Sequence, residues 1–337
     1  MRSNQVTIKD IARELGISPS TVSRALKDHP DISPETKKAV NTLAKKLNYQ
    51  PNAIALSLKH SRSFTLGVII PETVHYFFSS VISGIEDIAY DAGYHIMICQ
   101  SNELYDREKS NANMLYSNRV DGLLVSLSKE TRDFSHLEFF HQNNIPVVFF
   151  DRGTDAFPCD QIVIDDYEAA FRIVSYLIER GHKKLIHLAA PQHLDIGYNR
   201  KKGFEDALLK NGLPFSEGQI IYADKFDHGT EAVEAIIKKG DLPDGIFAVN
   251  DLTALGALRA LKRHQLKVPT DIGLAGFGNG QNAILVDPPL TTIDQNGYSM
   301  GKKAAEVLLE RINNGMENYT PQKHIIDTEL VIRESIR

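Results

Sequence analysis

The chain of 337 residues is long enough for about two domains, and its 42% hydrophobic and 24% charged content is typical of a soluble globular protein. Residues 1–62 hold 11 Lys and Arg against 5 Asp and Glu, whereas the whole chain has a net charge of −5. A basic head on an acidic body indicates nucleic-acid binding confined to the head. The sequence has no signal-peptide pattern and no apolar run of membrane-spanning length, so we expect a cytoplasmic protein with no membrane contact, in which Cys99 and Cys159 are free thiols.

The first expected element is a helix over residues 7–15. Thr7 can cap this helix, and Asp10 stands three residues on, as in a weaker form of the capping box. Gly16 then supplies a helix stop. One face of the helix is apolar, with the spacing of a buried stripe: Ile8, Ile11, Ala12 and Leu15.

A second helix is expected over residues 18–27, with Ser18 as the N-cap and Pro19 in the first turn. Its inward positions are Val22, Ala25 and Leu26, and its outward positions are Ser20, Thr21, Ser23, Arg24 and Lys27. An arginine can fork onto a guanine, and hydroxyls serve several acceptors. The pair of helices therefore predicts a DNA-binding helix-turn-helix, although by periodicity alone two small core helices would fit equally well.

A third helix is expected to begin at Ser33 and Pro34, with Val40, Leu43, Ala44 and Leu47 facing inward. Most of its lysines belong to a solvated face. Residues 53–59 can form a short helix that would be marginal alone in water. That segment is either a plain linker or a hinge that becomes helical only on DNA.

From residue 64 onward, short apolar runs alternate with helix-length segments. The first strands are expected at 66–70, 95–99, 122–125 and 146–150, with helices at 78–92 and 106–118. The pattern repeats from 162–164, with a helix from 166 to a stop at Gly181, strands at 185–189, 220–222, 245–249 and 272–275, and helices at 200–211, 229–239 and 252–265. The fold class is therefore α/β, with two successive modules of parallel sheet covered by helices, and a cleft is expected at the carboxyl ends of the strands.

Several side chains at these strand ends are candidates for a ligand site. Phe77 and Phe78 follow the first strand, although an aromatic pair is more often part of a core. Asp151 and Arg152 could face ligand hydroxyls or a carboxylate, or could form a surface ion pair. Asn250 can offer both a donor and an acceptor to a sugar hydroxyl, Asp251 could be only a helix cap, and Asn102 ends the second strand.

Other chemistries are disfavoured, and no cofactor or metal is expected. Residues 276–280 (Gly-Phe-Gly-Asn-Gly) lack the spacing of a dinucleotide-binding loop. His182, His187 and His193 do not have metal-ligand spacing on a helix, so structural roles are expected for them. The sequence has no G-x-S-x-G elbow, and no catalytic group of residues suggests an enzyme.

The head resembles the DNA-binding head of the lac-repressor/galactose-repressor (LacI/GalR) family. The matching words are Val-Thr-Ile-Lys-Asp-Ile-Ala at 6–12, Gly-Ile-Ser-x-x-Thr-Val-Ser-Arg at 16–24, Leu-Asn-Tyr-Gln-Pro-Asn at 47–52 and the hinge at 55–59. The body resembles the family's effector domain, which is like a periplasmic sugar-binding protein. This resemblance implies a chain that crosses between two subdomains three times, the last time at 289–293, and residues 322–333 alternate like an edge strand.

The resemblance also implies roles for residues of the head. Pro19, Ser20 and Arg24 occupy base-reading positions of the helix that Ser18 caps. Phosphate contacts are implied for Thr7, Thr21, Ser23, Tyr49 and Asn52. Leu58 matches a leucine that wedges into a minor-groove step, and Lys59 matches its neighbour. Pro19 departs from the family in having no long polar side chain, so its base would be read by apolar contact or not at all.

In the body, Arg200 matches the family's effector-contacting arginine, and Phe77 and Phe78 stand where the family places ligand-stacking aromatics. A departure occurs at Gly278, where the family usually has an aspartate. Glycine cannot accept the hydrogen bonds that aspartate gives a sugar, so Asn279 or a water substitutes, or the ligand lacks that contact.

We therefore expect a head at 1–51, a hinge and linker at 52–63, and an effector-binding and dimerisation domain at 64–337. Its N-subdomain is expected at about 64–161 plus 292–321, and its C-subdomain at about 162–291 plus 322–337. The expected function is that of a dimeric transcription regulator, most simply a repressor, that binds a near-palindromic operator under allosteric control by a small polar ligand such as a sugar. A sugar-binding transport component and an enzyme are the rival classes, and the sequence leaves open whether ligand releases or promotes DNA binding.

Overall fold

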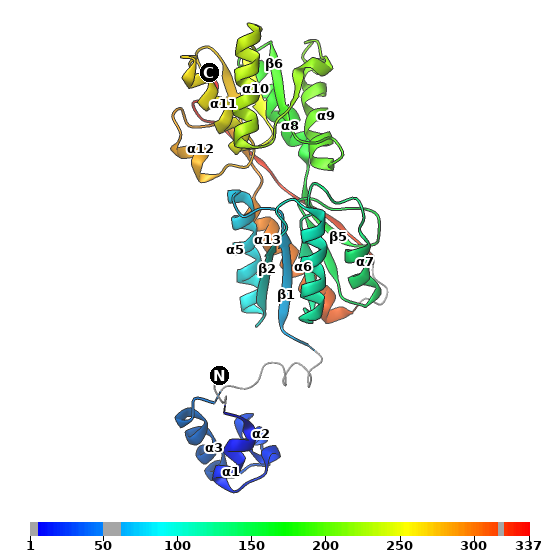
Figure 1. The fold of residues 1–337 in the computed structure, drawn as a ribbon, viewed down its shortest axis with the longest axis vertical. Helices are drawn as coiled ribbons and strands as arrows, with labels where there is room; N and C mark the ends of the chain where they lie inside the picture. Colours follow the sequence, from blue (N-terminus) through cyan, green and yellow to red (C-terminus); the bar gives the residue numbers. More distant parts are fainter. Residues whose placement is uncertain (1–5, 50–61, 316–319) are drawn as a thin grey trace. The chain divides into compact units, whose positions relative to one another are not determined.

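The computed structural model describes residues 6–49, 62–315 and 320–337. The chain forms two compact units, Met1–Phe64 and Thr65–Arg337, which we call the head and the body. Figure 1 shows the helices of the head and the two lobes of the body, coloured along the sequence.

The head contains three described helices, α1 (Ile8–Leu15), α2 (Pro19–Leu26) and α3 (Pro34–Lys46), which confirms the predicted order. The Asp10 carboxylate accepts hydrogen bonds from the Thr7 backbone N–H at 3.0 Å and from the Thr7 hydroxyl at 2.7 Å. Gly16 ends α1 in the left-handed region, with φ of 62°. The apolar stripes meet in a small core of buried side chains: Ile11, Ala12, Val22, Ala25, Val40, Leu43 and Ala44.

The first lobe of the body contains a six-stranded parallel sheet in the order β11-β5-β4-β3-β1-β2. Its strands are β1 (Thr65–Ile70), β2 (His95–Gln100), β3 (Gly122–Val125), β4 (Val147–Phe150), β5 (Asp160–Ile164) and β11 (Lys323–Ile326). One face packs against α5 (Tyr76–Asp91) and α13 (Gly297–Asn314). The other face packs against α6 (Tyr105–Ser117) and α7 (Ser135–Gln142). The near-continuous apolar runs of the central strands reflect this burial on both faces.

The second lobe contains a four-stranded parallel sheet in the order β7-β6-β8-β9. The strands are β6 (Leu185–Ala189), β7 (Ile220–Tyr222), β8 (Gly245–Ala248) and β9 (Gly273–Ala275). The accompanying helices are α8 (Asp166–Glu179), α9 (Asp195–Lys210), α10 (Phe226–Lys239), α11 (Asp251–Arg263) and α12 (Gln281–Leu285), with a 3₁₀ turn, η1, at Glu217–Gln219. Both lobes are thus helix-covered parallel sheets, as the sequence predicts.

The chain passes between the lobes along three segments. It enters the second lobe from β5 into α8, returns through β10 (Thr292–Asp294), and passes back through β12 (Glu329–Val331) (Figure 1). Strands β10 and β12 pair with each other as an antiparallel ribbon. At the end of the chain, the Ser335 hydroxyl donates a hydrogen bond to the Leu274 carbonyl at 2.6 Å, which fixes this last segment to β9.

The predicted subdomain boundaries are wrong at two strands. Strand β5 pairs with β4, and β11 pairs with β5, so both belong to the sheet of the first lobe rather than to the C-subdomain. Residues 322–333 are two strands in two sheets rather than one edge strand, and β12, not the segment 289–293, is the last crossing. The buried apolar run of β5 would suit either sheet, and the alternation of β11 does not reveal which strand it pairs with.

Some helices also differ from the prediction. Helix α9 begins at Asp195, five residues before the expected Arg200, and includes Gly197 in its first turn. Glycine lowers helix propensity, but a Cβ at this position would lie 2.3 Å from the Pro191 carbonyl oxygen, so close packing requires glycine here. Helices α7, α12 and α13 are not among the helices predicted from the sequence.

Candidate functional site

The candidate DNA-binding surface is the outward face of α2. The Ser18 hydroxyl accepts a hydrogen bond from the Thr21 backbone N–H at 3.1 Å, so the predicted N-cap of α2 is confirmed. Ser18, Pro19, Ser20 and Arg24 are exposed, and Thr21 and Ser23 are half-buried. Within the described part of the chain, no hydrogen bond or ion pair is formed by the Arg24 side chain.

The hydroxyls at the start of α2 lie close together. The Ser18 Oγ atom is 2.7 Å from Ser20 Oγ and 2.8 Å from Thr21 Oγ1. Because hydroxyls both donate and accept, this group can turn its hydrogens toward a phosphate or a base edge without moving the backbone. Thr7 is exposed beside α1, and Tyr49 packs partly against the core of the head, where burial raises the pKa of its phenol. The predicted contacts Asn52, Leu58 and Lys59 lie outside the described residues.

The candidate ligand site is a cavity of about 330 Å³ between the lobes of the body. Segments that follow β1, β3, β4, β6, β7, β8 and β9 all contribute to its wall, as expected at the carboxyl ends of parallel strands. The structure places most of the predicted ligand residues there: Phe77, Phe78, Asp151, Arg152, Arg200, Asn250 and Asp251. Its size and its mixture of aromatic and charged side chains suit a small polar ligand.

Arg200 is fixed in the wall of the cavity. Its Nε atom donates to Asp166 Oδ1 at 2.7 Å, and its Nη1 atom donates to the Val249 carbonyl at 2.6 Å. The guanidinium lies 3.6 Å from the ring centre of Phe277, a stacking distance. Burial raises the pKa of Asp166 to about 6, even though the neighbouring Arg200 charge acts to lower it. The arginine is thereby held in one orientation before any ligand arrives.

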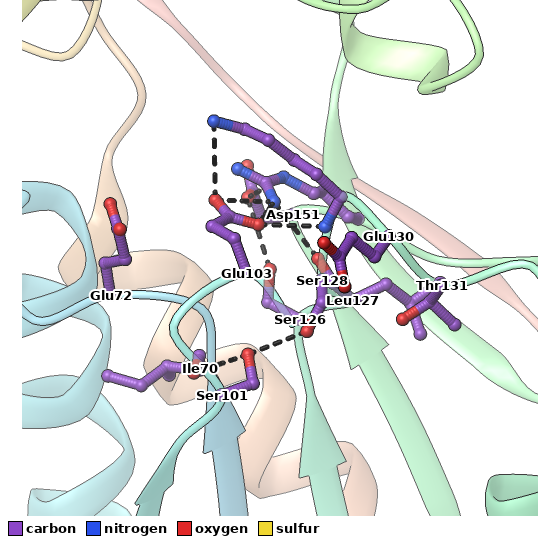
Figure 2. A network of polar contacts seen from close by, with 12 residues as sticks. Ile70, Glu72, Ser101, Glu103, Ser126, Leu127, Ser128, Glu130, Thr131 and Asp151 are labelled. Carbon is purple, nitrogen blue, oxygen red and sulfur yellow. Dashed lines mark hydrogen bonds and ion pairs between the residues drawn. The ribbon is translucent and has the colours of Figure 1, made fainter. Parts of the chain in front are cut away.

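The side chains of Arg152 and Asp151 keep only 11% and 7% of their surface exposed, so their ion pair of 3.7 Å is not the exposed pair considered from the sequence. Arg152 Nη1 donates to Glu103 Oε2 at 2.8 Å and to the Leu127 carbonyl at 3.1 Å. Asp151 accepts a hydrogen bond of 3.3 Å from the Ser126 hydroxyl, and Figure 2 shows this contact beside Glu103. Burial raises the pKa of the Asp151 carboxyl, so hydroxyl donors from a ligand would stabilise its ionised form.

Asn250 and Asp251 have roles that the sequence left open. The Asn250 side chain is the N-cap of α11, since its oxygen accepts from the Thr253 backbone N–H at 2.8 Å. Asp251 lies inside the helix, where its carboxylate accepts from the Thr292 hydroxyl at 2.6 Å and from the Gly280 N–H at 2.8 Å. Asp251 therefore joins α11 to β10, and the cap is Asn250 rather than Asp251.

Two predicted ligand residues, Asn102 and Asn279, do not line the cavity. The Asn279 amide donates to Asp294 Oδ2 at 2.8 Å and accepts from Arg333 at 2.5 Å, so it joins the crossing segments. Asn102 accepts a hydrogen bond from Gln100. Asn102 and Asn279 have left-handed backbones, with φ of 54° and 51°. The sequence pattern does not predict this conformation, which changes the direction of the chain after the strand.

Gly278 lines the cavity with φ of 130°. An L side chain rarely adopts this conformation, so the aspartate usual in related sequences would be strained on this backbone. A Cβ here would lie 3.6 Å from Asp251 Oδ2. An aspartate at this position would therefore require a different local backbone, and Asn279 does not supply a carboxylate or line the cavity.

The sequence analysis missed several cavity residues, notably Lys129, Asp224 and Phe277. Lys129 and Asp224 follow β3 and β7, so the rule that ligands bind at the carboxyl ends of the strands could have predicted both residues. Phe277 stands between Gly276 and Gly278, in a segment that was considered for its glycines rather than its ring.

The predicted structural role of His187 agrees with its surroundings. Its ring stacks on Phe247 and Phe204, with centroid distances of 4.5 Å and 5.6 Å. Its Nδ1 atom lies 3.0 Å from the Phe247 carbonyl and must donate, because a carbonyl only accepts. Burial lowers the pKa of His187 to about 4. Among the described residues, no group of three or more His, Cys, Asp or Glu side chains could hold a metal ion.

The cysteines Cys99 and Cys159 are buried free thiols, as predicted. A search of the described residues finds no helix with the length and apolar content needed to cross a membrane.

Two family models match the chain. Residues 7–52 match bacterial regulatory proteins of the lacI family, and residues 63–334 match the periplasmic binding proteins and sugar binding domain of the LacI family. The HTH-type transcriptional repressor PurR of Actinobacillus pleuropneumoniae serotype 3 is 34% identical over 333 residues, with 98% of each chain covered. Catabolite control protein A of Priestia megaterium is 34% identical over 310 residues, covering 91% of this chain and 93% of that protein.

Solved structures show the same similarity. A transcriptional regulator CelR–cellobiose complex has a TM-score of 0.74 and 26% identity, with 98% of this chain and 99% of the other covered. A lac repressor dimer bound to operator and an anti-inducer has a TM-score of 0.86 at 24% identity over the same shares of the two chains, which shows a common fold.

Proposed function

The chain belongs to the LacI family of bacterial regulatory proteins, and from this premise we propose that it represses transcription as a homodimer on a near-palindromic operator. Its repressor relatives support the general role of a DNA-binding transcription regulator, and they are not enzymes. Since its partner is chromosomal DNA, the bacterial cytoplasm is its place of action.

The observation that carries the DNA-binding proposal is Arg24. This exposed side chain is held on a helix whose start is fixed by the Ser18 cap, and it has no acidic partner among the described residues. An arginine in this position can form a bidentate contact to guanine O6 and N7, the commonest specific contact in a major groove. Ser20 supplies a hydroxyl beside it for a base edge, and Thr21 and Ser23 supply hydroxyls for phosphates.

The dimer is supported by apolar side chains on the surface of the body. Strand β2 is an edge strand and exposes Ile98, and α12 exposes Ile284 and Leu285. Ile284 and Leu285 are neighbours on α12, with 56% and 81% of their surface exposed, so they form a small apolar patch. A second copy that covered these surfaces would present two heads to two half-sites, and a two-fold dimer favours a near-palindromic operator.

The proposed effector is a sugar or a sugar derivative. Phe77, Phe78 and Phe277 provide aromatic rings in the cavity, while Asp151 and Arg200 provide an acceptor and a donor for hydroxyls. The CelR structure was solved with cellobiose, which supports the carbohydrate class without naming this ligand. A ligand that contacts both lobes stabilises the closed cleft, and a change in the cleft would alter the spacing of the two heads. Such coupling is typically about 1–3 kcal/mol, or roughly 5- to 150-fold in DNA affinity.

Selection of genomic fragments by the purified full-length chain tests the proposed regulator. We expect enrichment of one near-palindromic sequence, with binding that weakens steeply as salt rises. A transport component or an enzyme on the same fold would enrich no sequence. A fragment set without a common motif, both in the absence of sugars and with a sugar that stabilises the protein, would contradict the proposal.

A further inference from the structure

Contacts from the second lobe converge on Lys129 of the first lobe. Lys129 follows β3, and its Nζ atom lies 2.7 Å from Oδ2 of Asp224, which follows β7 in the second lobe. The Lys129 carbonyl accepts a hydrogen bond of 3.0 Å from Nε2 of His193, which follows β6. One residue thus receives an ion pair and a hydrogen bond from across the cavity.

Lys129 is also fixed from within its own lobe. Its backbone N–H donates to Glu103 Oε2 at 2.8 Å, and its Nζ atom is 3.6 Å from Glu103 Oε1. Glu103 is in turn paired with Arg152. Figure 2 shows Glu103 beside Ser128 and Asp151, where these contacts meet. Contacts within the first lobe therefore hold the Lys129 backbone and place the Glu103 carboxylate beside its ammonium group.

A fully buried carboxylate anchors the loop that carries Lys129. Glu108 accepts hydrogen bonds from the Ser128 N–H at 2.6 Å, the Ser128 hydroxyl at 2.7 Å and the Thr131 hydroxyl at 2.9 Å. His136 Nε2 lies 3.0 Å from the same carboxylate. A carboxylate removed from water requires several such partners, and here they lie on both sides of Lys129 in the sequence.

The side chains of Lys129 and Asp224 keep only 20% and 13% of their surface exposed. Salt screens such a partly buried pair less than a surface pair, and a surface pair contributes little. Burial alone would raise the pKa of Asp224, but Lys129, together with a smaller contribution from His228, outweighs burial and lowers that pKa. The Asp224 carboxylate therefore lies within ion-pair distance of the Lys129 ammonium group across the lobe boundary.

We propose that Lys129 and Asp224 form an ionic clasp that holds the two lobes together and so sets the affinity of the cavity for its ligand. The proposal rests on the proposed function, since it concerns regulation of the same cavity. Both partners are protein groups, so their attraction favours the closed body whether or not a ligand is bound. The apparent dissociation constant of a ligand is its intrinsic constant divided by the fraction of molecules in the binding-competent state. A stronger clasp therefore gives tighter binding.

Ligand affinity alone cannot test the clasp, because Lys129 and Asp224 also line the cavity and could contact a sugar directly. The distance between the lobes in the absence of sugar does not depend on whether Lys129 or Asp224 contacts a ligand. We would measure it by double electron–electron resonance on the full-length chain without DNA or sugar. Labels would be placed at Glu138 of α7 and Lys238 of α10, which are both exposed, after replacement of Cys99 and Cys159 by alanine. Dilution with unlabelled chains confines the signal to distances within one chain.

The decisive variants are Lys129→Met, Asp224→Asn and Lys129→Arg. The first two remove one charge with little change of shape, and we expect both to broaden the distance distribution toward longer separations. Lys129→Arg keeps the positive charge, so it should retain the wild-type distance distribution. The matched control is Lys201→Met, because Lys201 has 19% side-chain exposure and its pair with Glu217, at 2.8 Å, lies within one lobe.

Wild-type distributions in both Lys129→Met and Asp224→Asn would overturn the clasp, as would equal broadening in Lys201→Met. Failure of Lys129→Arg to restore the distribution would also overturn it, because the role would then not depend on charge. None of these outcomes requires an operator or an effector. The clasp can therefore fail while the regulator stands, and the fragment selection can fail while the clasp stands.

Discussion

The head and the body hold their functional residues in opposite ways. On the head, the candidate DNA-contacting side chains at residues 18–24 are neighbours in the sequence, and Arg24 is exposed. In the body, the cavity residues come from loops far apart in the chain, and Arg200 and Asp251 are buried and bonded to structural partners. Recognition of DNA is therefore separable from folding, whereas ligand binding depends on the same contacts that stabilise the body.

This difference decides what can be predicted from the sequence. The caps at Ser18 and Ser33 and the stop at Gly16 are local, so they were predicted and the structure confirms them. The strand-end rule also predicts Asp151 and Asn250 for one cavity, because the parallel strands of each sheet end at one edge, whereas Arg200 was predicted from the family resemblance.

What could not be predicted depends on which strands pair and where the crossing segments lie. Asn279 follows β9 as a ligand residue would, but Arg333 approaches from the C-terminal segment and binds its side chain. Strand β5 has the apolar run of either lobe, and only its register with β4 assigns it to the first. These are long-range choices, and residue types in one segment do not specify them.

Arg200→Ala tests the dependence of the cavity on structural contacts and should have the largest effect. It leaves Asp166 buried without its cation, a loss of about 3–5 kcal/mol in the free energy of unfolding of the body. Denaturant unfolding measures this loss, and calorimetry with a sugar that binds the wild type should show no binding. Adding Asp166→Ala should recover part of the stability but none of the binding. Wild-type stability in Arg200→Ala would contradict the structural role.

The second prediction concerns acid stability of the body. His187 has an unfolded pKa of about 6.5, and burial lowers its folded pKa to about 4. Its contribution to the free energy of unfolding is fully present above the unfolded pKa of about 6.5. This contribution is lost as pH falls toward 4, by about 3 kcal/mol in total. The difference in unfolding free energy between the wild type and His187→Phe should change with pH across this window. A difference that stays constant would refute the buried neutral imidazole.

Arg24→Ala tests the claim that the head recognises DNA through exposed side chains that do not stabilise its fold. Loss of a bidentate contact to guanine should cost about 1–3 kcal/mol per half-site and relax sequence preference, while weak nonspecific binding remains. Fluorescence anisotropy with the selected operator and a scrambled duplex measures both. The thermal stability of the head should not change, since the side chain is exposed. Unchanged discrimination in Arg24→Ala would disprove the assignment of α2, and Lys38→Ala on α3 provides an exposed control.

Ser18→Ala tests whether the stability of α2 affects operator affinity, and it should have the smallest effect of these substitutions. Removing this N-cap should destabilise α2 by about 1 kcal/mol. Operator affinity should fall with it, because the helix that presents Arg24 is less often formed. Ser18→Asp should retain the cap, so its unfolding should match the wild type by circular dichroism. Equal stability of Ser18→Ala and Ser18→Asp would mean that the hydrogen bond to Thr21 contributes nothing.

The central claim is that occupancy of the cavity controls the DNA affinity of the head. The most direct measurement is a titration of the selected operator with the full-length chain, with and without a saturating sugar found by thermal-shift screening of mono- and disaccharides, cellobiose among them. We predict that operator affinity changes about 5- to 150-fold, in either direction, and that Arg200→Ala does not respond. An unchanged operator affinity at a sugar concentration that demonstrably fills the cavity would contradict the claim.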